Sequence, residues 1–141
     1  MPFDTGNKIV QLCAEGMSAE FTGDMQQAKL LFQQAWEIAA TDFEKFTAAH
    51  YVARHRENAE ETLRWNELAL SHAIKIDSDE MKTHYPSLYL NIGKSQEDLG
   101  HTVEAIANYQ LAEKSSVYLP EDAYGDMIRF GIRGALKRMN L

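Results

Sequence analysis

Five histidines stand out in this sequence because imidazole binds metal ions and exchanges protons near neutral pH. They are His50, His55, His72, His84 and His101. His50 and His55 are five positions apart, which is too far round a helix for the two rings to share a face. The segment between them also lacks the acidic residue and the spacing of a zinc-protease motif. We therefore expect no metal site and no cofactor.

Two further groups match catalytic motifs only in part. Gly93-Lys94-Ser95 matches the end of a phosphate-binding loop, but the full motif requires a glycine where Leu88 stands and a loop before a helix. Cys13, the single cysteine, has no neighbour in the sequence that would lower the pKa of its thiol. We interpret it as a buried or groove-facing side chain. These residues favour a protein that is not an enzyme.

Composition narrows the class of protein further. The 141 residues, of which 45% are hydrophobic and 25% charged, suffice for a single domain with a packed core. A net charge of -7 argues against a partner that is held through its phosphates. The apolar stretches are too short to span a membrane. With one cysteine and no basic segment before an apolar run at the amino terminus, we expect a cytoplasmic protein that binds neither nucleic acid nor membrane.

Helical periodicity runs through the whole chain, and part of it repeats. The stretch 88–120 indicates two antiparallel helices with a turn at Gly100. Small and aromatic residues of this stretch have counterparts 77 positions earlier. The five matched pairs are Gly16 and Gly93, Gly23 and Gly100, Ala28 and Ala105, Phe32 and Tyr109, and Ala35 and Ala112.

This order of glycine, alanine and aromatic residues resembles the tetratricopeptide repeat (TPR), including bacterial members of that family. The resemblance covers nearly all of the chain and implies an all-α superhelix, a TPR-like solenoid, in one domain over 1–141. We predict three helical hairpins over about 9–42, 43–76 and 86–119. We also predict an insertion over about 77–85 and a C-terminal capping helix over about 121–139. Strands should be absent.

The middle hairpin departs from the repeat pattern. A repeat of about 34 residues places His50, Thr62 and Asn66 where glycine, alanine and an aromatic residue are expected. A small internal cluster of hydrogen-bonded polar side chains explains these residues structurally. A functional histidine pocket is the alternative, and the sequence does not separate the two.

The resemblance also implies a binding surface, because the first helix of each repeat lines the concave face in this family. The positions carried over are Val10, Cys13, Met17, Glu20 and Phe21, then Glu44, Thr47, Tyr51, Arg54 and His55, then Ser87, Leu90, Asn91, Lys94 and Asp98. The partner-binding groove that we predict consists of Met17, Phe21, Tyr51, Arg54, His55, Asn91 and Lys94. Family members use an asparagine at the position of Asn91 to hold a peptide backbone.

We therefore expect a non-catalytic module that binds a peptide or helix of a protein partner in this groove. Tyr and Arg are frequent anchors of interfaces, and Arg pairs with carboxylates. In a purely structural alternative, Arg54 pairs with Glu20, Glu97 or Asp98 and Tyr51 only packs.

Two other classes of function stay open. In the first the protein is a self-associating scaffold, a homodimer, in which the glycine-bearing last helix packs against a second copy. In the other it is a small-molecule sensor or enzyme with a pocket of His50, Tyr51, His55 and Tyr85.

Overall fold

Helices account for all the regular structure in residues 6–141, the part of the chain that this computed structural model describes. No strand occurs within these residues, as the sequence predicts. The chain divides into two compact units, Met1–Ile76 and Asp77–Leu141. Each unit is described below by itself.

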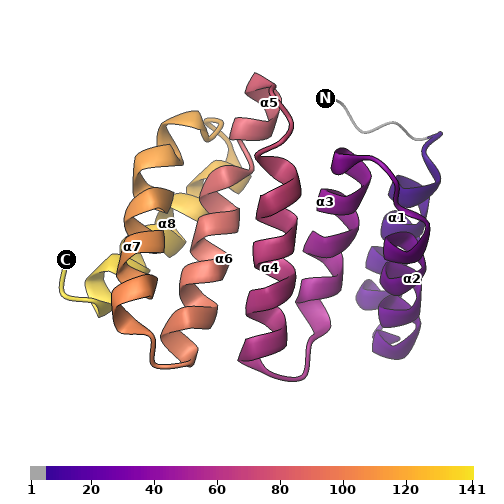
Figure 1. Ribbon diagram of the computed structural model, residues 1–141, viewed down its shortest axis with the longest axis horizontal. Helices are drawn as coiled ribbons and strands as arrows, with labels where there is room; N and C mark the ends of the chain where they lie inside the picture. Colours follow the sequence, from indigo (N-terminus) through magenta and orange to yellow (C-terminus); the bar gives the residue numbers. More distant parts are fainter. Residues whose placement is uncertain (1–5) are drawn as a thin grey trace. The chain divides into compact units, whose positions relative to one another are not determined.

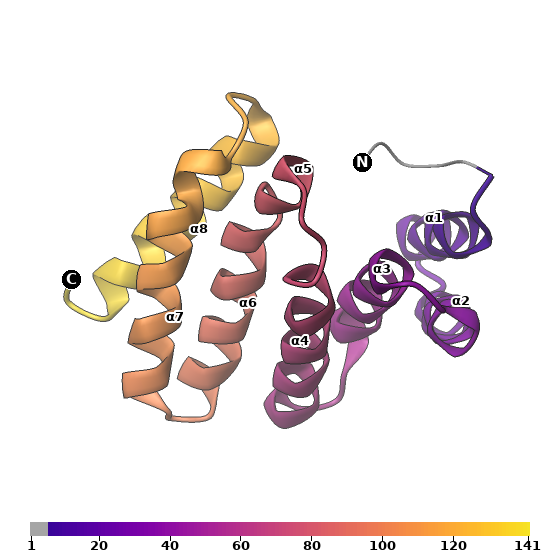
Figure 2. The same cartoon turned by 45° about the horizontal axis from the view of Figure 1, so that its top comes forward.

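The first unit consists of two helical hairpins (Figure 1). Its elements are α1 (Lys8–Phe21), α2 (Met25–Ile38), α3 (Asp42–Val52), the short 3-10 helix η1 (Ala53–His55) and α4 (Ala59–Ala73). Helix α1 packs against both α2 and α3, and α3 packs against α4. Figure 2 shows α1, α2 and α3 from a second direction, close to their helix axes. The core between them is apolar, and it includes Leu12, Cys13, Ala28, Phe32 and Val52.

The tight turns of this unit come from glycine and from polar caps. Gly23 has a φ of +85°, a left-handed conformation that glycine adopts without a steric cost, and it ends the α1 segment. Asn7 caps α1 by accepting from the amide of Ile9 at 2.8 Å. Thr41 and Glu44 form a reciprocal capping box at the start of α3. These caps fix where α1 and α3 begin.

One carboxylate ties the beginnings of α1 and α3 together. Glu44 accepts from the side-chain amide of Asn7 at 3.0 Å and from the backbone amides of Ala40 and Thr41 at 3.0 and 3.1 Å. The two backbone donors are the main cause of its lowered pKa. The face between α1 and α3 is thus held at one end by a charged cap.

The second unit contains a third hairpin and a terminal helix. Its elements are α5 (Asp79–Lys82), α6 (Tyr85–Asp98), α7 (Thr102–Ser115), the 3-10 helix η2 (Ser116–Tyr118) and α8 (Ala123–Arg138). Gly100 turns the chain between α6 and α7 with a φ of +80°. Helix α8 packs against both helices of the hairpin. In Figure 1 these elements run from red through orange to yellow.

Several predicted boundaries need correction. The first hairpin is predicted to extend to about 42, but α2 ends at Ile38 because Thr41 is needed as the N-cap of α3. The first half of the hairpin predicted over about 43–76 is divided into α3 and η1. The segment predicted as an insertion over about 77–85 contains α5, and Ser78 caps this helix. Pro86 lies in the first turn of α6, where a missing amide hydrogen costs nothing.

Candidate functional site

The face between α1 and α3 contains an apolar depression in the first unit. The depression measures about 160 Å³, and its lining residues are Val10, Cys13, Ala14, Met17, Thr47 and Tyr51. All except Ala14 are positions that the sequence analysis carries over to the concave face of a repeat. The arrangement follows from helix geometry, because residues three and four apart share a face of α1 and of α3.

The chemistry of the depression is that of a contact surface. Cys13 is buried, and burial raises the pKa of its thiol to about 12, so the thiolate is scarce at neutral pH. The hydroxyl of Thr47 donates to the carbonyl of Phe43 at 2.8 Å and is therefore satisfied within its own helix. Burial is also the main reason for the raised pKa of Tyr51. These side chains offer shape and apolar area to a ligand, and no activated nucleophile.

A charged cluster borders the depression. Glu20 on α1 pairs with Arg54 at 3.1 Å and with Nε2 of His55 at 2.5 Å, and both partners come from η1. The Arg54 guanidinium also lies 5.6 Å from the centroid of the Tyr51 ring. Tyr51 and His55 each stack on the buried ring of Phe32, at centroid distances of 5.1 and 6.0 Å. The Arg54–Glu20 pair is one of those named in the structural alternative.

The first unit thus contains five of the seven predicted groove residues, and their environments differ. Met17 lines the depression and is 39% exposed, whereas Phe21 is 94% exposed and is not among the lining residues. Tyr51 forms the wall on α3. Arg54 and His55 are held by Glu20 at the border.

The other two predicted residues belong to the second unit, on α6. Asn91 is half-buried, and Lys94 is exposed and pairs with Asp98 at 2.5 Å, one helical turn away. An exposed pair of this kind contributes little to stability, so Lys94 can exchange partners. For both residues, a role in binding a partner at the surface of α6 stays a prediction.

The polar residues at the repeat positions of the middle hairpin lie in different environments. Thr62 donates its hydroxyl to the carbonyl of Asn58 at 3.0 Å, within its own helix. Asn66 is buried on α4. The His50 ring lies 5.3 Å from the ring of Tyr51 and 6.3 Å from that of Phe46. Tyr85, the fourth member of the alternative small-molecule pocket, is in the second unit.

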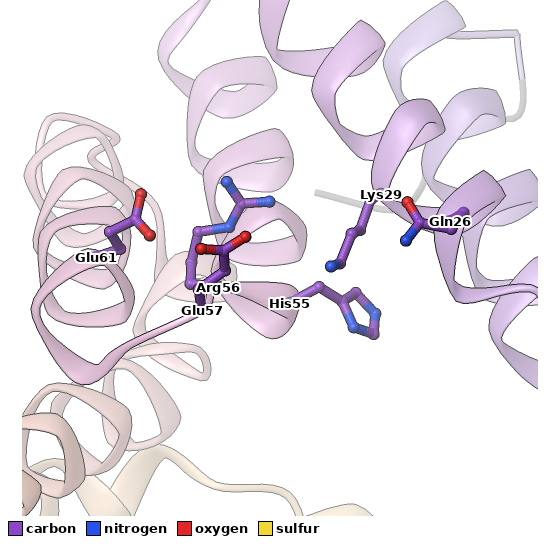
Figure 3. Close-up of a pocket in the computed structure, with 6 residues that line it drawn as sticks. All are labelled: Gln26, Lys29, His55, Arg56, Glu57 and Glu61. Atoms are coloured by element: carbon purple, nitrogen blue, oxygen red, sulfur yellow. The ribbon is translucent and has the colours of Figure 1, made fainter.

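The structure also has a second depression in the first unit, which sequence reasoning missed. It measures about 380 Å³, and its lining residues are Gln26, Lys29, His55, Arg56, Glu57 and Glu61. Figure 3 shows Gln26 and Lys29 on one side, Glu61 on the other, and Arg56 and Glu57 between them. The sequence signal was the charged run 54–61 at a position where the other two hairpins have a glycine turn.

The comparisons with known proteins give no further guide. The chain matches no family model, no curated protein and no solved structure. In residues 6–141 no three histidine, cysteine, aspartate or glutamate side chains gather as a potential metal site. No helix in this part of the chain has the length and apolar character required to cross a membrane.

Proposed function

We propose that the protein is a TPR-like helical-repeat module that binds a protein partner without catalysis. The observation that carries the proposal is the depression between α1 and α3, which gathers positions predicted to line a concave binding face. Its lining is mostly apolar, and the Glu20 cluster lies at its border.

The packing of two hairpins supports the repeat character. A Cβ atom added to Gly16 would lie 2.3 Å from the ring of Phe32, and one added to Gly93 would lie 2.6 Å from the ring of Tyr109. The aromatic ring of the second helix thus occupies the space that the glycine of the first helix leaves. These are two of the pairs separated by 77 positions in the sequence. Equivalent packing at equivalent positions is what a repeated unit requires.

The proposed partner presents an apolar side chain next to a carboxylate. The apolar group enters the depression beside Met17 and Tyr51, where complete burial of a leucine-sized side chain contributes about 1.5–3 kcal/mol. Arg54 receives the carboxylate, because its side chain is 46% exposed, whereas the Glu20 side chain paired with it is 12% exposed. Glu20 keeps a partner after this exchange, since His55 also contacts it.

A capture experiment with two double variants tests the proposal. Met17→Asp with Arg54→Glu changes the depression and its charged border. Leu111→Asp with Lys114→Glu introduces the same charges on α7, and Leu111 is 43% exposed, which is close to the 39% of Met17. Helical content of all proteins is first compared by circular dichroism.

We expect wild type and the α7 variant to capture the same protein from a lysate of the native cell. The variant with Met17→Asp and Arg54→Glu should capture at least about tenfold less of this protein, which is equivalent to about 1.4 kcal/mol of binding free energy. Equal capture by both variants would show that the depression is not the binding site.

Self-association through α8 is the second candidate, because this helix exposes large apolar side chains. Met127 and Phe130 are 62% and 72% exposed and lie three residues apart on one face. The molar mass in solution decides between the candidates. A dimer at all concentrations that becomes a monomer on Phe130→Asp favours the scaffold, and a monomeric wild type favours an open groove.

A further inference from the structure

The lining of the second depression of the first unit differs in composition from that of the depression between α1 and α3. All six of its lining residues are polar or charged, and its volume of about 380 Å³ lies in the range of pockets that hold small molecules. The residues come from the first two turns of α2, from the end of η1 and the connection that follows it, and from the first turn of α4. A ligand of this depression must therefore be polar. Its binding does not depend on the protein partner proposed above.

Two of the lining residues, Lys29 and Arg56, are cationic, and Lys29 lies on the side formed by α2 (Figure 3). Lys29 and Arg56 form no ion pair with any residue in 6–141, and Nε of Arg56 is buried without a hydrogen-bond partner there. A carboxylate is the acceptor that best fits a guanidinium. The nearby start of α2 has no acidic residue in its first turn, although Asp24 caps it. The helix dipole therefore adds positive potential on this side.

Two further lining residues are acidic, and Glu61 lies on the side opposite Lys29, with Glu57 beside Arg56 in the middle (Figure 3). Glu57 and Glu61 also form no ion pair with the described part of the chain, although they line the same depression as Lys29 and Arg56. Glu61 lies in the first turn of α4 together with Glu60, and these two carboxylates offset the positive end of that helix. In Figure 3 Glu61 and Lys29 lie on opposite sides of Arg56 and Glu57.

We propose that this depression binds a small zwitterion whose carboxylate contacts Arg56 and Lys29 and whose ammonium group contacts Glu57 and Glu61. The two cations form no ion pair with the two carboxylates, and a ligand with both charges offers a counter-charge to each kind of group. A simple anion meets two carboxylates in the same depression and a protein with a net charge of -7. A simple cation leaves Lys29 and Arg56 without a counter-charge.

Binding is measured by NMR on the full chain, using amide shifts of the 15N-labelled protein. The zwitterionic probes are glycine, 4-aminobutyrate and 6-aminohexanoate, which carry the two charges at increasing separations. Hexanoate and hexylamine each keep one of the charges of 6-aminohexanoate, and inorganic phosphate tests for a general anion site. We expect saturable shifts confined to 26–29 and 55–61 with at least one zwitterion, and binding at least about tenfold weaker for both single-charge probes.

Two variants test the assigned contacts. Arg56→Gln should weaken the best zwitterion about tenfold or more. Glu61→Gln should weaken the zwitterion and leave hexanoate unchanged or bound more tightly, so that the preference between the two falls. Lys114→Gln and Glu113→Gln make the same charge changes on exposed positions of α7 and should leave binding as in wild type.

Several results would overturn the proposal. Equal affinity for hexanoate and 6-aminohexanoate, or binding of phosphate alone, would indicate an anion site. Absence of saturable shifts with all three zwitterions would show that the depression is a solvated surface. Unchanged binding in the folded Arg56→Gln variant would place the ligand elsewhere.

Discussion

The α1–α2 and α6–α7 hairpins differ from the α3–α4 hairpin at the turn and at the helix contact. In the first two, a glycine with positive φ makes a tight turn, and a second glycine accommodates an aromatic ring. In the α3–α4 hairpin the chain passes through η1 and a longer connection before α4 starts at Ala59. This longer connection supplies His55, Arg56 and Glu57 to the polar depression. Loss of the compact turn therefore coincides with the polar depression.

The largest expected effect comes from filling the glycine contact of the two regular hairpins. In Gly16→Val or Gly93→Val the new side chain overlaps the ring of Phe32 or Tyr109, which are both almost completely buried. We expect each variant to lose about 3 kcal/mol of unfolding free energy in urea.

Gly134→Ala is the matched control, because a Cβ atom there has only Arg138 nearby, at 3.8 Å. It should gain up to about 1 kcal/mol from helix propensity. Similar losses in all three variants would mean that glycine is not required by the aromatic rings.

The next effect tests the turns. Gly23→Ala and Gly100→Ala should each cost about 1–2 kcal/mol, because alanine is strained at φ values of +85° and +80°. Nothing lies within 4 Å of a Cβ atom at either position, so the cost is one of conformation alone. Replacement of both glycines by asparagine, which tolerates this conformation better, should recover part of the loss. An alanine variant as stable as wild type would contradict the assigned turns.

A third prediction concerns acid stability in the second unit. Glu97 accepts from the hydroxyl of Tyr109 at 2.6 Å and from Arg138 at 3.0 Å. The hydrogen bond from Arg138 is the main cause that lowers the pKa of Glu97 from its ordinary value of 4.5. Because the folded-state pKa is the lower one, this stabilisation is present above pH 4.5 and is lost as the pH falls through the folded-state pKa.

Glu97→Gln should therefore be less stable than wild type near neutral pH, by less than about 1 kcal/mol for a contact at the surface. The difference should shrink as the pH falls below about 5, in urea unfolding followed by circular dichroism. Glu104→Gln, an exposed position on α7, serves as the control. A difference that does not change with pH would rule out this role of Glu97.

The smallest expected change in unfolding free energy comes from a substitution in the middle hairpin, and it distinguishes this hairpin from the first one. Thr62 stands at the position of Ala28 in the first hairpin, but it is half-buried and its hydroxyl is satisfied within α4. Thr62→Ala should change the unfolding free energy by no more than about 0.5 kcal/mol. Ala28 is completely buried, and Ala28→Thr should cost about 2 kcal/mol through overpacking. Equal effects would mean that the two positions have equivalent surroundings.

The sequence predicts the regular hairpins better than the irregular one for a physical reason. Glycine turns and glycine-aromatic contacts are local and need particular residue types, so the pairs at 16 and 93 or 23 and 100 are visible in the sequence. The end of α2 was placed too late because periodicity alone does not show that Thr41 caps the next helix.

The candidate site was predicted in part for the same reason. The residues of the α1–α3 depression follow helical spacing, and the structure brings Cys13, Met17 and Tyr51 together. The polar depression depends on how η1 orients Arg56 relative to Lys29, which lies on another hairpin. No periodicity in the sequence encodes that relation.

The most direct test of partner binding is photocrosslinking in the native cell. A p-benzoylphenylalanine residue replaces Met17, which lines the depression, or Ala107, which is exposed on α7. We predict one discrete crosslinked product from position 17, its loss when Arg54→Glu is added, and no such product from position 107. Identical products from both positions, or none from position 17, would contradict the assignment of the α1–α3 depression as the binding site.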